Sequence, residues 1–133
     1  EKKLKDSYAK KDEDGNPILA GDEERRFFEA PWIHKYKGKY YLSYSTGNTH
    51  KIAYAISDRP DGPFVYQGTI LNPVLGWTTH QSIVEFKGKW YLFYHDASLS
   101  GGLNHQRSMK FTEIKYNEDG TIQTIDPYPE ENK

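Results

Sequence analysis

The sequence predicts an all-β fold of the β-propeller class, with about two blades in this chain. Three observations support this prediction. A strand motif recurs at an offset of fifty residues, each repeat holds several short strand patterns bounded by turns, and no stretch has helical periodicity. Repeats of about 40–50 residues built from several short strands are typical of propeller blades. We therefore expect blades at about residues 27–72 and 73–126, followed by a short polar tail up to residue 133.

The repeat is defined by a turn and the strand that follows it. Residues 37–44 read KGKYYLSY and residues 87–94 read KGKWYLFY, so six of eight positions are identical. Upstream of this motif, Ile33 matches Ile83 and Tyr36 matches Phe86 at the same offset. Agreement at so many positions and one fixed spacing indicates two copies of one structural unit.

Strands can be placed within each unit from turn residues and from alternation. The first unit is expected to hold strands at residues 31–36, 39–46, 51–57 and 64–67, with turns at 37–38 and 58–63. The second unit is expected to hold strands at residues 81–86, 89–96, 107–116 and 121–125, with a turn at 117–120. The second strand of each unit is apolar on both faces, so we expect it to be covered on both sides.

Residues 1–26 are a polar N-terminal segment, which we expect to be the end of a preceding blade. Residues 1–28 contain eight acidic and seven basic side chains and little that could fill a core. Two blades cannot close a ring, and alone they would leave apolar faces and open strand edges in water. The chain is therefore expected to be completed by missing N-terminal blades or by a second chain.

Composition excludes several classes of function. The chain has 18 basic and 19 acidic residues and no cysteine, so neither nucleic acid, an anionic membrane nor a thiolate metal site is expected. No apolar run approaches the ~20 residues that span a bilayer. Phosphate-loop, nucleophile-elbow and zinc-protease motifs are absent from the sequence, and no organic cofactor is expected. The compartment stays open between secreted, periplasmic and cytoplasmic.

The two units differ just before their first strands, and we expect functional residues where the repeat breaks. At the offset of fifty, Glu29 corresponds to Thr79, and Ala30 corresponds to His80. In a propeller these positions face one mouth of the central channel, a usual place for ligands. Glu29 lies among Phe28, Pro31 and Trp32, and desolvation by such neighbours favours a protonated carboxyl, as a general acid requires. The alternative for Glu29 is an exposed loop glutamate.

The other candidate residues have structural alternatives. His80 fits a metal ligand, a substrate contact or a core histidine held by hydrogen bonds; no second ligand at metal-binding spacing accompanies it. Arg107 follows a glycine-containing loop at residues 98–104 and fits either a sugar contact or a solvated strand-edge residue. Trp32 and Trp77 fit either sugar stacking or core packing. The remaining histidines, His34, His50, His95 and His105, have no paired motif and are interpreted as surface or strand residues.

Taken in order, these motifs resemble glycoside hydrolase family 43 over about residues 27–126. The resemblance rests on FEAPWI at 28–33, GKYYLSYS at 38–45, IAYA at 52–55, GPF at 62–64, GWTTHQS at 76–82, YLFYHD at 91–96, RS at 107–108 and NEDGTI at 117–122. It implies that the chain is the C-terminal part, about two blades, of a five-bladed propeller.

The resemblance also implies roles for individual residues. Glu29 would be the general acid that protonates the leaving glycosidic oxygen. His80 would bind a structural central calcium ion or its water shell. Substrate-binding residues would be Trp32, Trp77, Thr79 and Arg107, with Arg107 contacting the sugar in the cleavage subsite.

The family resembles other inverting glycosidases, which need a second carboxylate as base about 6.5–9.5 Å from the acid. Nothing in residues 1–28 matches the motifs of the base or of the carboxylate that tunes the acid, so the chain is expected to be inactive alone. The implied substrates are arabinose- or xylose-containing oligosaccharides and plant polysaccharides. The motif at residues 76–80 favours an α-L-arabinofuranosidase over a β-xylosidase. The alternatives are a non-catalytic carbohydrate-binding propeller and a protein-interaction propeller.

Overall fold

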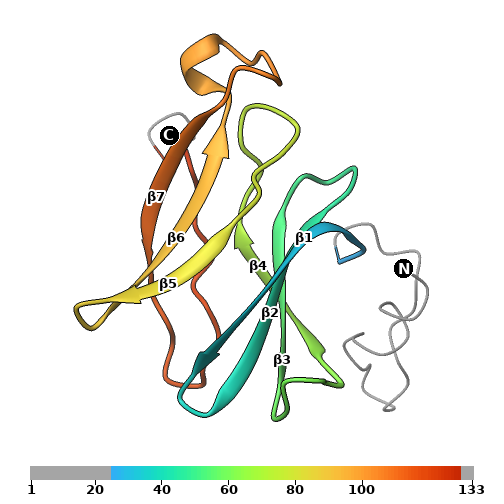
Figure 1. Cartoon of the computed structure of the whole chain (residues 1–133), viewed down its shortest axis with the longest axis vertical. Coiled ribbons are helices and arrows are strands. Elements are labelled where there is room, and N and C mark those ends of the chain that lie inside the picture. The colour runs from blue at the N-terminus through green and yellow to red at the C-terminus, as the bar shows by residue number, and fades with distance from the viewer. Residues whose placement is uncertain (1–24, 130–133) are drawn as a thin grey trace.

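The computed structural model describes residues 25–129 and contains two antiparallel β-sheets (Figure 1). The first sheet has the strand order β1-β2-β3-β4, and the second has the order β5-β6-β7. Between β6 and β7 lies one turn of 3-10 helix, η1. The elements are β1 (Phe27–Tyr36), β2 (Lys39–Thr46), β3 (Ile52–Ser57), β4 (Val65–Leu71), β5 (Ser82–Phe86), β6 (Lys89–Asp96), η1 (Ser98–Ser100) and β7 (Ser108–Ile114).

The repeat predicts the central strands well. β2 and β6 have the expected bounds, and each is entered through a two-residue turn at the offset of fifty. Both residues of each turn have positive φ: 46° and 79° at Lys37 and Gly38, and 51° and 78° at Lys87 and Gly88. Turns of this kind match the right-handed twist of the strands that they join. The turn chemistry therefore fixes both hairpins locally.

The prediction of a fourth strand at residues 121–125 in the second sheet is wrong. This segment makes only isolated bridges, one between Tyr116 and Ile122 and one, parallel, between Leu71 and Ile125. The Ile125 amide donates to the Ile70 carbonyl at 2.8 Å, and the Asn72 amide donates to the Ile125 carbonyl at 3.0 Å. β4 is an edge strand with a free row of backbone groups, so the C-terminal segment pairs there and ties the two sheets together.

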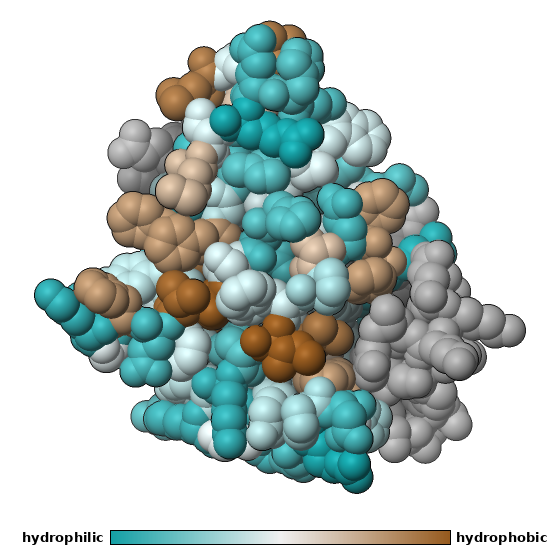
Figure 2. Space-filling model, viewed as in Figure 1, coloured by the Kyte–Doolittle hydropathy of each residue, from teal (hydrophilic) through white to brown (hydrophobic). Residues whose placement is uncertain are grey.

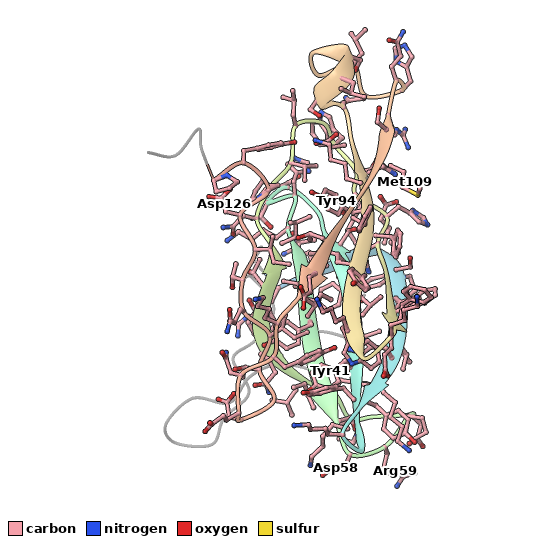
Figure 3. All side chains as sticks on the ribbon, turned by 90° about the vertical axis from the view of Figure 1, so that its left-hand side faces the viewer. Tyr41, Asp58, Arg59, Tyr94, Met109 and Asp126 are labelled. Atoms are coloured by element: carbon pink, nitrogen blue, oxygen red, sulfur yellow. The ribbon has the colours of Figure 1, made fainter. Side chains whose placement is uncertain are left out.

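A shared core lies between the two sheets. Tyr41 of β2 and Tyr94 of β6 both point into it (Figure 3). Buried tyrosines also use their hydroxyls: that of Tyr41 donates to the Gly120 carbonyl at 2.6 Å, and that of Tyr54 accepts from the Ile122 amide at 2.8 Å. The remaining buried members of this core are Ile52, Ile70, Leu71, Val74, Ile83, Leu92, Ile114 and Ile122.

The two sheets differ on their outer faces. The outer face of the first sheet carries a second cluster, formed by Leu42, Tyr44, Ala53, Ala55 and Phe64, so β2 is buried on both sides as predicted. The outer face of the second sheet is open: Met109 and Phe111 are 77% and 65% exposed, and Figure 3 shows Met109 pointing away from the core. Apolar side chains also gather on the surface over β1 and β5 (Figure 2). The prediction of two-sided cover thus holds for β2 but not for β6 within this chain.

Helical structure is confined, in the part of the chain that the structure describes, to η1. None of the helical structure between residues 25 and 129 has the length and apolar character needed to cross a membrane. The η1 turn belongs to the loop between β6 and β7, which lies at the same end of the molecule as the β4–β5 connection (Figure 1). The candidate site is built around these loops.

Candidate functional site

Glu29 stands on a distorted part of β1. In the ladder with β2 it lies opposite Ser45, and the register shifts on both sides of it. One shift falls between Phe27 and Glu29, and the other falls between Glu29 and Trp32. Ala30, directly after Glu29, has a φ of 60°, in the left-handed region that non-glycine residues rarely occupy. Such bulges redirect side chains out of the regular alternation of a strand, and they are common next to functional sites.

Glu29 is half-buried and lines a pocket of about 320 Å³. Trp77, 63% exposed, forms part of the wall of this pocket. The ring of His50 packs edge-on against Trp77, with centroids 4.5 Å apart and an interplanar angle of 80°. A carboxyl beside an exposed indole offers the polar group and the flat apolar surface that a sugar ring requires. The other lining residues are Arg26, Phe28, Ser45, Thr46, Gly47 and Asn48.

Charged candidate residues converge near His95 at the end of β6. Burial lowers the pKa of the His95 imidazole, and the positive charges of Arg107 and His80 lower this pKa further. Asp96 and Glu29 act in the opposite direction on the same pKa. The folded chain therefore brings Glu29, His80 and Arg107 close enough to influence one histidine, although they lie on three separate segments.

His95 also anchors the loop that carries Trp77. Its Nε2 is 2.6 Å from the Thr78 hydroxyl, and its backbone amide donates to the Thr79 carbonyl at 2.9 Å. Two residues further along, the Ala97 amide donates to the Leu75 carbonyl at 2.8 Å. The loop is thus docked along the end of β6 by three hydrogen bonds.

The loop approaches β6 closely because of Gly76. This residue has a φ of 111°, and a Cβ there would lie 3.1 Å from the Cβ of Ala97. A side chain at position 76 would therefore both strain the backbone and push the loop away from β6.

Two of the predicted residues present their side chains to solvent. His80 is exposed and has a φ of 44°, so it is not a core histidine. Arg107 is exposed at the start of β7, where its Nε donates a hydrogen bond to the Asn104 carbonyl. Both side chains are therefore accessible to a ligand.

The remaining two predicted residues make contacts between the sheets. The Trp32 indole N–H donates to the Ile83 carbonyl at 3.1 Å, and the ring is 37% exposed. Thr79 is buried, and its hydroxyl lies 3.2 Å from that of Ser45. Their substrate-binding roles stay predictions.

The described residues do not form a calcium site by themselves. No group of three or more His, Asp or Glu side chains suited to a metal occurs within residues 25–129. Calcium takes about six to eight oxygen ligands, whereas His80 offers one imidazole nitrogen. Of the two alternatives in the prediction, a contact through the water shell of an ion fits this donor better than direct ligation.

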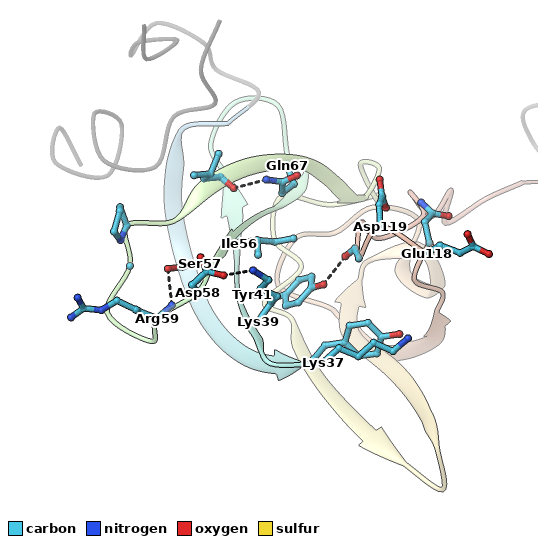
Figure 4. Close-up of a pocket in the computed structure, with 16 residues that line it drawn as sticks. Lys37, Lys39, Tyr41, Ile56, Ser57, Asp58, Arg59, Gln67, Glu118 and Asp119 are labelled. Atoms are coloured by element: carbon cyan, nitrogen blue, oxygen red, sulfur yellow. Dashed lines mark hydrogen bonds and ion pairs between the residues drawn. The ribbon is translucent and has the colours of Figure 1, made fainter. Parts of the chain in front are cut away.

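A larger pocket, of about 750 Å³, lies away from these residues (Figure 4). It opens between the β3–β4 turn and the turn at residues 117–120. Several of its polar side chains already have hydrogen-bond partners within the chain: Lys39 pairs with Asp58, and Gln67 donates to the Val65 carbonyl. None of the predicted site residues lines it, so the smaller pocket beside Glu29 is the better candidate despite its size.

Sequence reasoning missed three residues at this site: His50, Gln81 and His95. His50 and His95 were interpreted as ordinary surface or strand residues because neither sits in a paired motif. Gln81 Nε2 donates to the Ala30 carbonyl at 2.7 Å across 51 residues of sequence. Contacts of this range have no local signature, although the position of Gln81 directly after His80 was a usable hint.

Comparison with known proteins gives consistent results. The sequence profile described as "Glycosyl hydrolases family 43" matches residues 2–122. The chain is 64% identical over 115 residues to a xylosidase/arabinosidase from Bacteroides ovatus, covering 86% of this chain and 35% of that protein. It is 59% identical over 114 residues to a β-xylosidase from Xylanibacter ruminicola, with the same two coverages. The chain therefore spans about a third of the length of these relatives.

Solved structures agree with the fold. A family 43 β-xylosidase/α-arabinofuranosidase from a compost microbial metagenome, crystallised with xylotriose in a calcium-free form, has a TM-score of 0.83 and 68% identity. This match covers 91% of the present chain and 37% of the other. A family 43 enzyme from Xanthomonas citri has a TM-score of 0.85 and 58% identity, over 92% and 37% of the two chains. The all-β architecture and these partial matches confirm the predicted fold class, part of a β-propeller.

Proposed function

The chain belongs to glycosyl hydrolase family 43, and from this premise we propose that it supplies the general-acid part of an enzyme that cleaves xylose- and arabinose-containing glycans. The observation that carries the proposal is the placement of Glu29. This carboxyl stands on a doubly bulged strand, beside an exposed indole, in a pocket large enough for a sugar ring. His80 and Arg107 lie near this carboxyl, since all three side chains influence the pKa of His95.

In the proposed reaction, Glu29 donates its proton to the glycosidic oxygen as the bond to the anomeric carbon breaks. Water attacks the opposite face of the sugar, which inverts the configuration and requires a carboxylate base about 6.5–9.5 Å from the acid. Asp96 does not suit that role, because it is fully buried and paired with Lys110 at 2.7 Å. We assign the base to the part of the propeller outside this chain, so the chain alone should be inactive.

The substrate proposal combines the pocket with the relatives. Trp77 would stack on the sugar ring, and Arg107 would donate to its hydroxyls, since a guanidinium offers several donors in a fixed geometry. Two of the most similar proteins carry names that join xylosidase and arabinosidase, and a third is named β-xylosidase. We therefore propose activity on both β-xylosides and α-L-arabinofuranosides, which gives xylosides more weight than the motif at residues 76–80 suggested.

The rest of the propeller would cover the faces that this chain leaves open. The outer face of the second sheet exposes Met109 and Phe111, and the ring of Phe111 stacks on Phe93 with centroids 5.6 Å apart. An apolar surface of this kind usually marks an interface. We propose the missing blades as its partner. In a purified complete protein these side chains should be protected from solvent.

A role for calcium is proposed only at His80. The compost-metagenome relative was described in a calcium-free form, which is a statement about that protein. When present, the ion would supply a fixed positive charge near the channel axis. His80 would hold its water shell. A His80→Ala variant of the complete propeller should then bind Ca²⁺ more weakly in isothermal titration, and unchanged affinity would remove His80 from the metal's surroundings.

The test uses a complete propeller, made by placing this chain in the Bacteroides ovatus xylosidase/arabinosidase in exchange for the matching segment. Glu29→Gln should lower kcat/KM about 10²–10⁴-fold on xylobiose, whose leaving group needs a proton. On dinitrophenyl xyloside, whose leaving group departs without one, the loss should be small. Glu118→Gln, in the exposed turn at residues 117–120, is the matched control. Equal losses by Glu29→Gln on both substrates would contradict the acid assignment.

A further inference from the structure

We propose that Gln81 is a positioning residue, which holds the bulge of β1 that presents Glu29. The inference rests on the proposed role of Glu29 as the acid. It assigns to the segment before β5 a task distinct from binding sugar or metal: fixing the backbone of the neighbouring sheet.

The bulge needs a partner from outside its own ladder. Between the pairs Glu29↔Ser45 and Trp32↔Ser43, β1 contains two residues where β2 contains one. The extra residue interrupts the regular hydrogen bonding of the two strands. Ala30, within this interruption, has a positive φ. A backbone held in this region persists only when its surroundings enforce it.

Gln81 provides that enforcement. Its side chain is 3% exposed, and its Nε2 donates to the Ala30 carbonyl at 2.7 Å and to the Ser43 hydroxyl at 3.3 Å. One amide group thus bridges both strands at the bulge. Because the Gln81 side chain is buried, this hydrogen bond is strong, and it fixes the peptide between Ala30 and Pro31, one residue after Glu29.

Thr79 acts on the other side of Glu29. Its buried hydroxyl lies 3.2 Å from the hydroxyl of Ser45, the residue directly opposite Glu29 in the ladder. The Thr79 carbonyl accepts from the His95 amide, so the segment that holds the bulge is itself fastened to β6. Residues 79 and 81 are buried, whereas His80 between them is exposed. The left-handed bend at His80 thus leaves two side chains toward the bulge and one toward the solvent.

The expected consequence is specific to proton donation. Displacing a catalytic group by about 1 Å can reduce a rate about 10²-fold. A loosened bulge would misplace the Glu29 carboxyl but leave the sugar-binding side chains on other segments in position. The loss should therefore appear in kcat on substrates whose leaving group requires a proton, and KM should change little.

The experiment compares two substrates in the complete propeller described above. Gln81→Met keeps the length of the side chain and removes the donor. It should lower kcat on xylobiose about tenfold or more and change kcat on dinitrophenyl xyloside less than about threefold. Thr79→Val, which is isosteric and removes the hydroxyl, should show the same pattern and serves if Gln81→Met does not fold. A Thr79 that binds sugar would instead raise KM on both substrates.

Tyr54→Phe is the matched control. It removes another buried hydrogen bond between segments, the one from the Ile122 amide, without touching the bulge. It should lower stability but leave the ratio of the two rates unchanged. If Gln81→Met lowers both rates equally, or neither, the inference is overturned while Glu29 keeps its role. If Glu29→Gln itself shows no leaving-group dependence, the proposed function fails first.

Discussion

His34 should make the stability of the fold depend on pH below neutrality. This side chain lies on β1 and is 7% exposed, between the rings of Tyr41 and Trp90 at centroid distances of 4.8 and 5.2 Å. Its Nε2 shares a hydrogen bond of 2.7 Å with the Tyr116 hydroxyl, and its Nδ1 is buried without a partner among the described residues. Burial lowers the pKa of His34 from 6.5 to about 4.

The magnitude follows from the two protonation equilibria. The unfolded chain binds a proton at His34 near pH 6.5, whereas the folded chain resists protonation until about pH 4. Stability from the neutral imidazole is thus fully present above pH 6.5 and is lost as the pH falls from 6.5 toward 4. Integrating over this window gives a loss of about 2 kcal/mol by pH 5 and about 3 kcal/mol by pH 4.

Two measurements check this expectation. An NMR titration should find that the His34 imidazole protonates near pH 4. Urea unfolding at several pH values should show that His34→Phe flattens the acid limb by the same 3 kcal/mol, roughly, since Phe cannot bind a proton. Carboxylates contribute equally to both proteins, so the difference isolates His34. Parallel acid limbs for the two proteins would refute the reasoning.

Two further predictions concern side chains at the site and beside it. Trp77→Ala should raise KM for xylo-oligosaccharides about tenfold with little change in kcat, because it removes the flat wall of the pocket. A sugar-binding role is refuted if steady-state kinetics show an unchanged KM. Lys110→Met should destabilise the fold by about 3 kcal/mol, because it leaves the buried Asp96 carboxylate without its cation. Burial alone would raise the pKa of Asp96, but hydrogen bonds from Lys110, Tyr128 and Ser98 outweigh it and lower this pKa. The variant should therefore lose most stability near neutral pH, and chemical unfolding that matches the parent would contradict it.

The sequence was sufficient for strands whose partners are close in the chain. β2 and β6 were predicted to the residue, because a left-handed two-residue turn and an alternating aromatic pattern specify a hairpin locally. The segment at residues 121–125 does not form the predicted fourth strand of the second sheet, because Ile125 instead bridges to Leu71 of β4 across more than fifty residues. Which edge a final segment joins depends on the relative placement of two sheets, and no local pattern encodes it.

The site shows the same division. Glu29 could be found because the repeat provides an internal reference, and a carboxyl that replaces a small polar residue stands out against it. His95 could not be found in this way. Its importance comes from the hydrogen bond with Thr78 and from charges carried by three other segments. The burial of Thr79 could likewise not be predicted from the sequence, since a threonine beside a loop histidine is equally consistent with a buried residue and with a sugar contact.

The two units also have the same backbone conformation at positions fifty residues apart, and this explains how a residue of the second unit can support the first. Ala30 and His80 are equivalent in sequence, and both have positive φ, 60° and 44°. A positive φ costs about 1–2 kcal/mol in a residue with a side chain. Because both units have it at the same position, this backbone bend is a feature of the repeat and is not specific to the unit that carries Glu29. In the first unit Pro31 follows the bend and has no side-chain donor. In the second unit Gln81 occupies that position and donates to the carbonyl of the first bend. The two units therefore have the same backbone bend but different roles. The first unit carries the Glu29 carboxyl at its bend, and Gln81 of the second unit holds that bend in place.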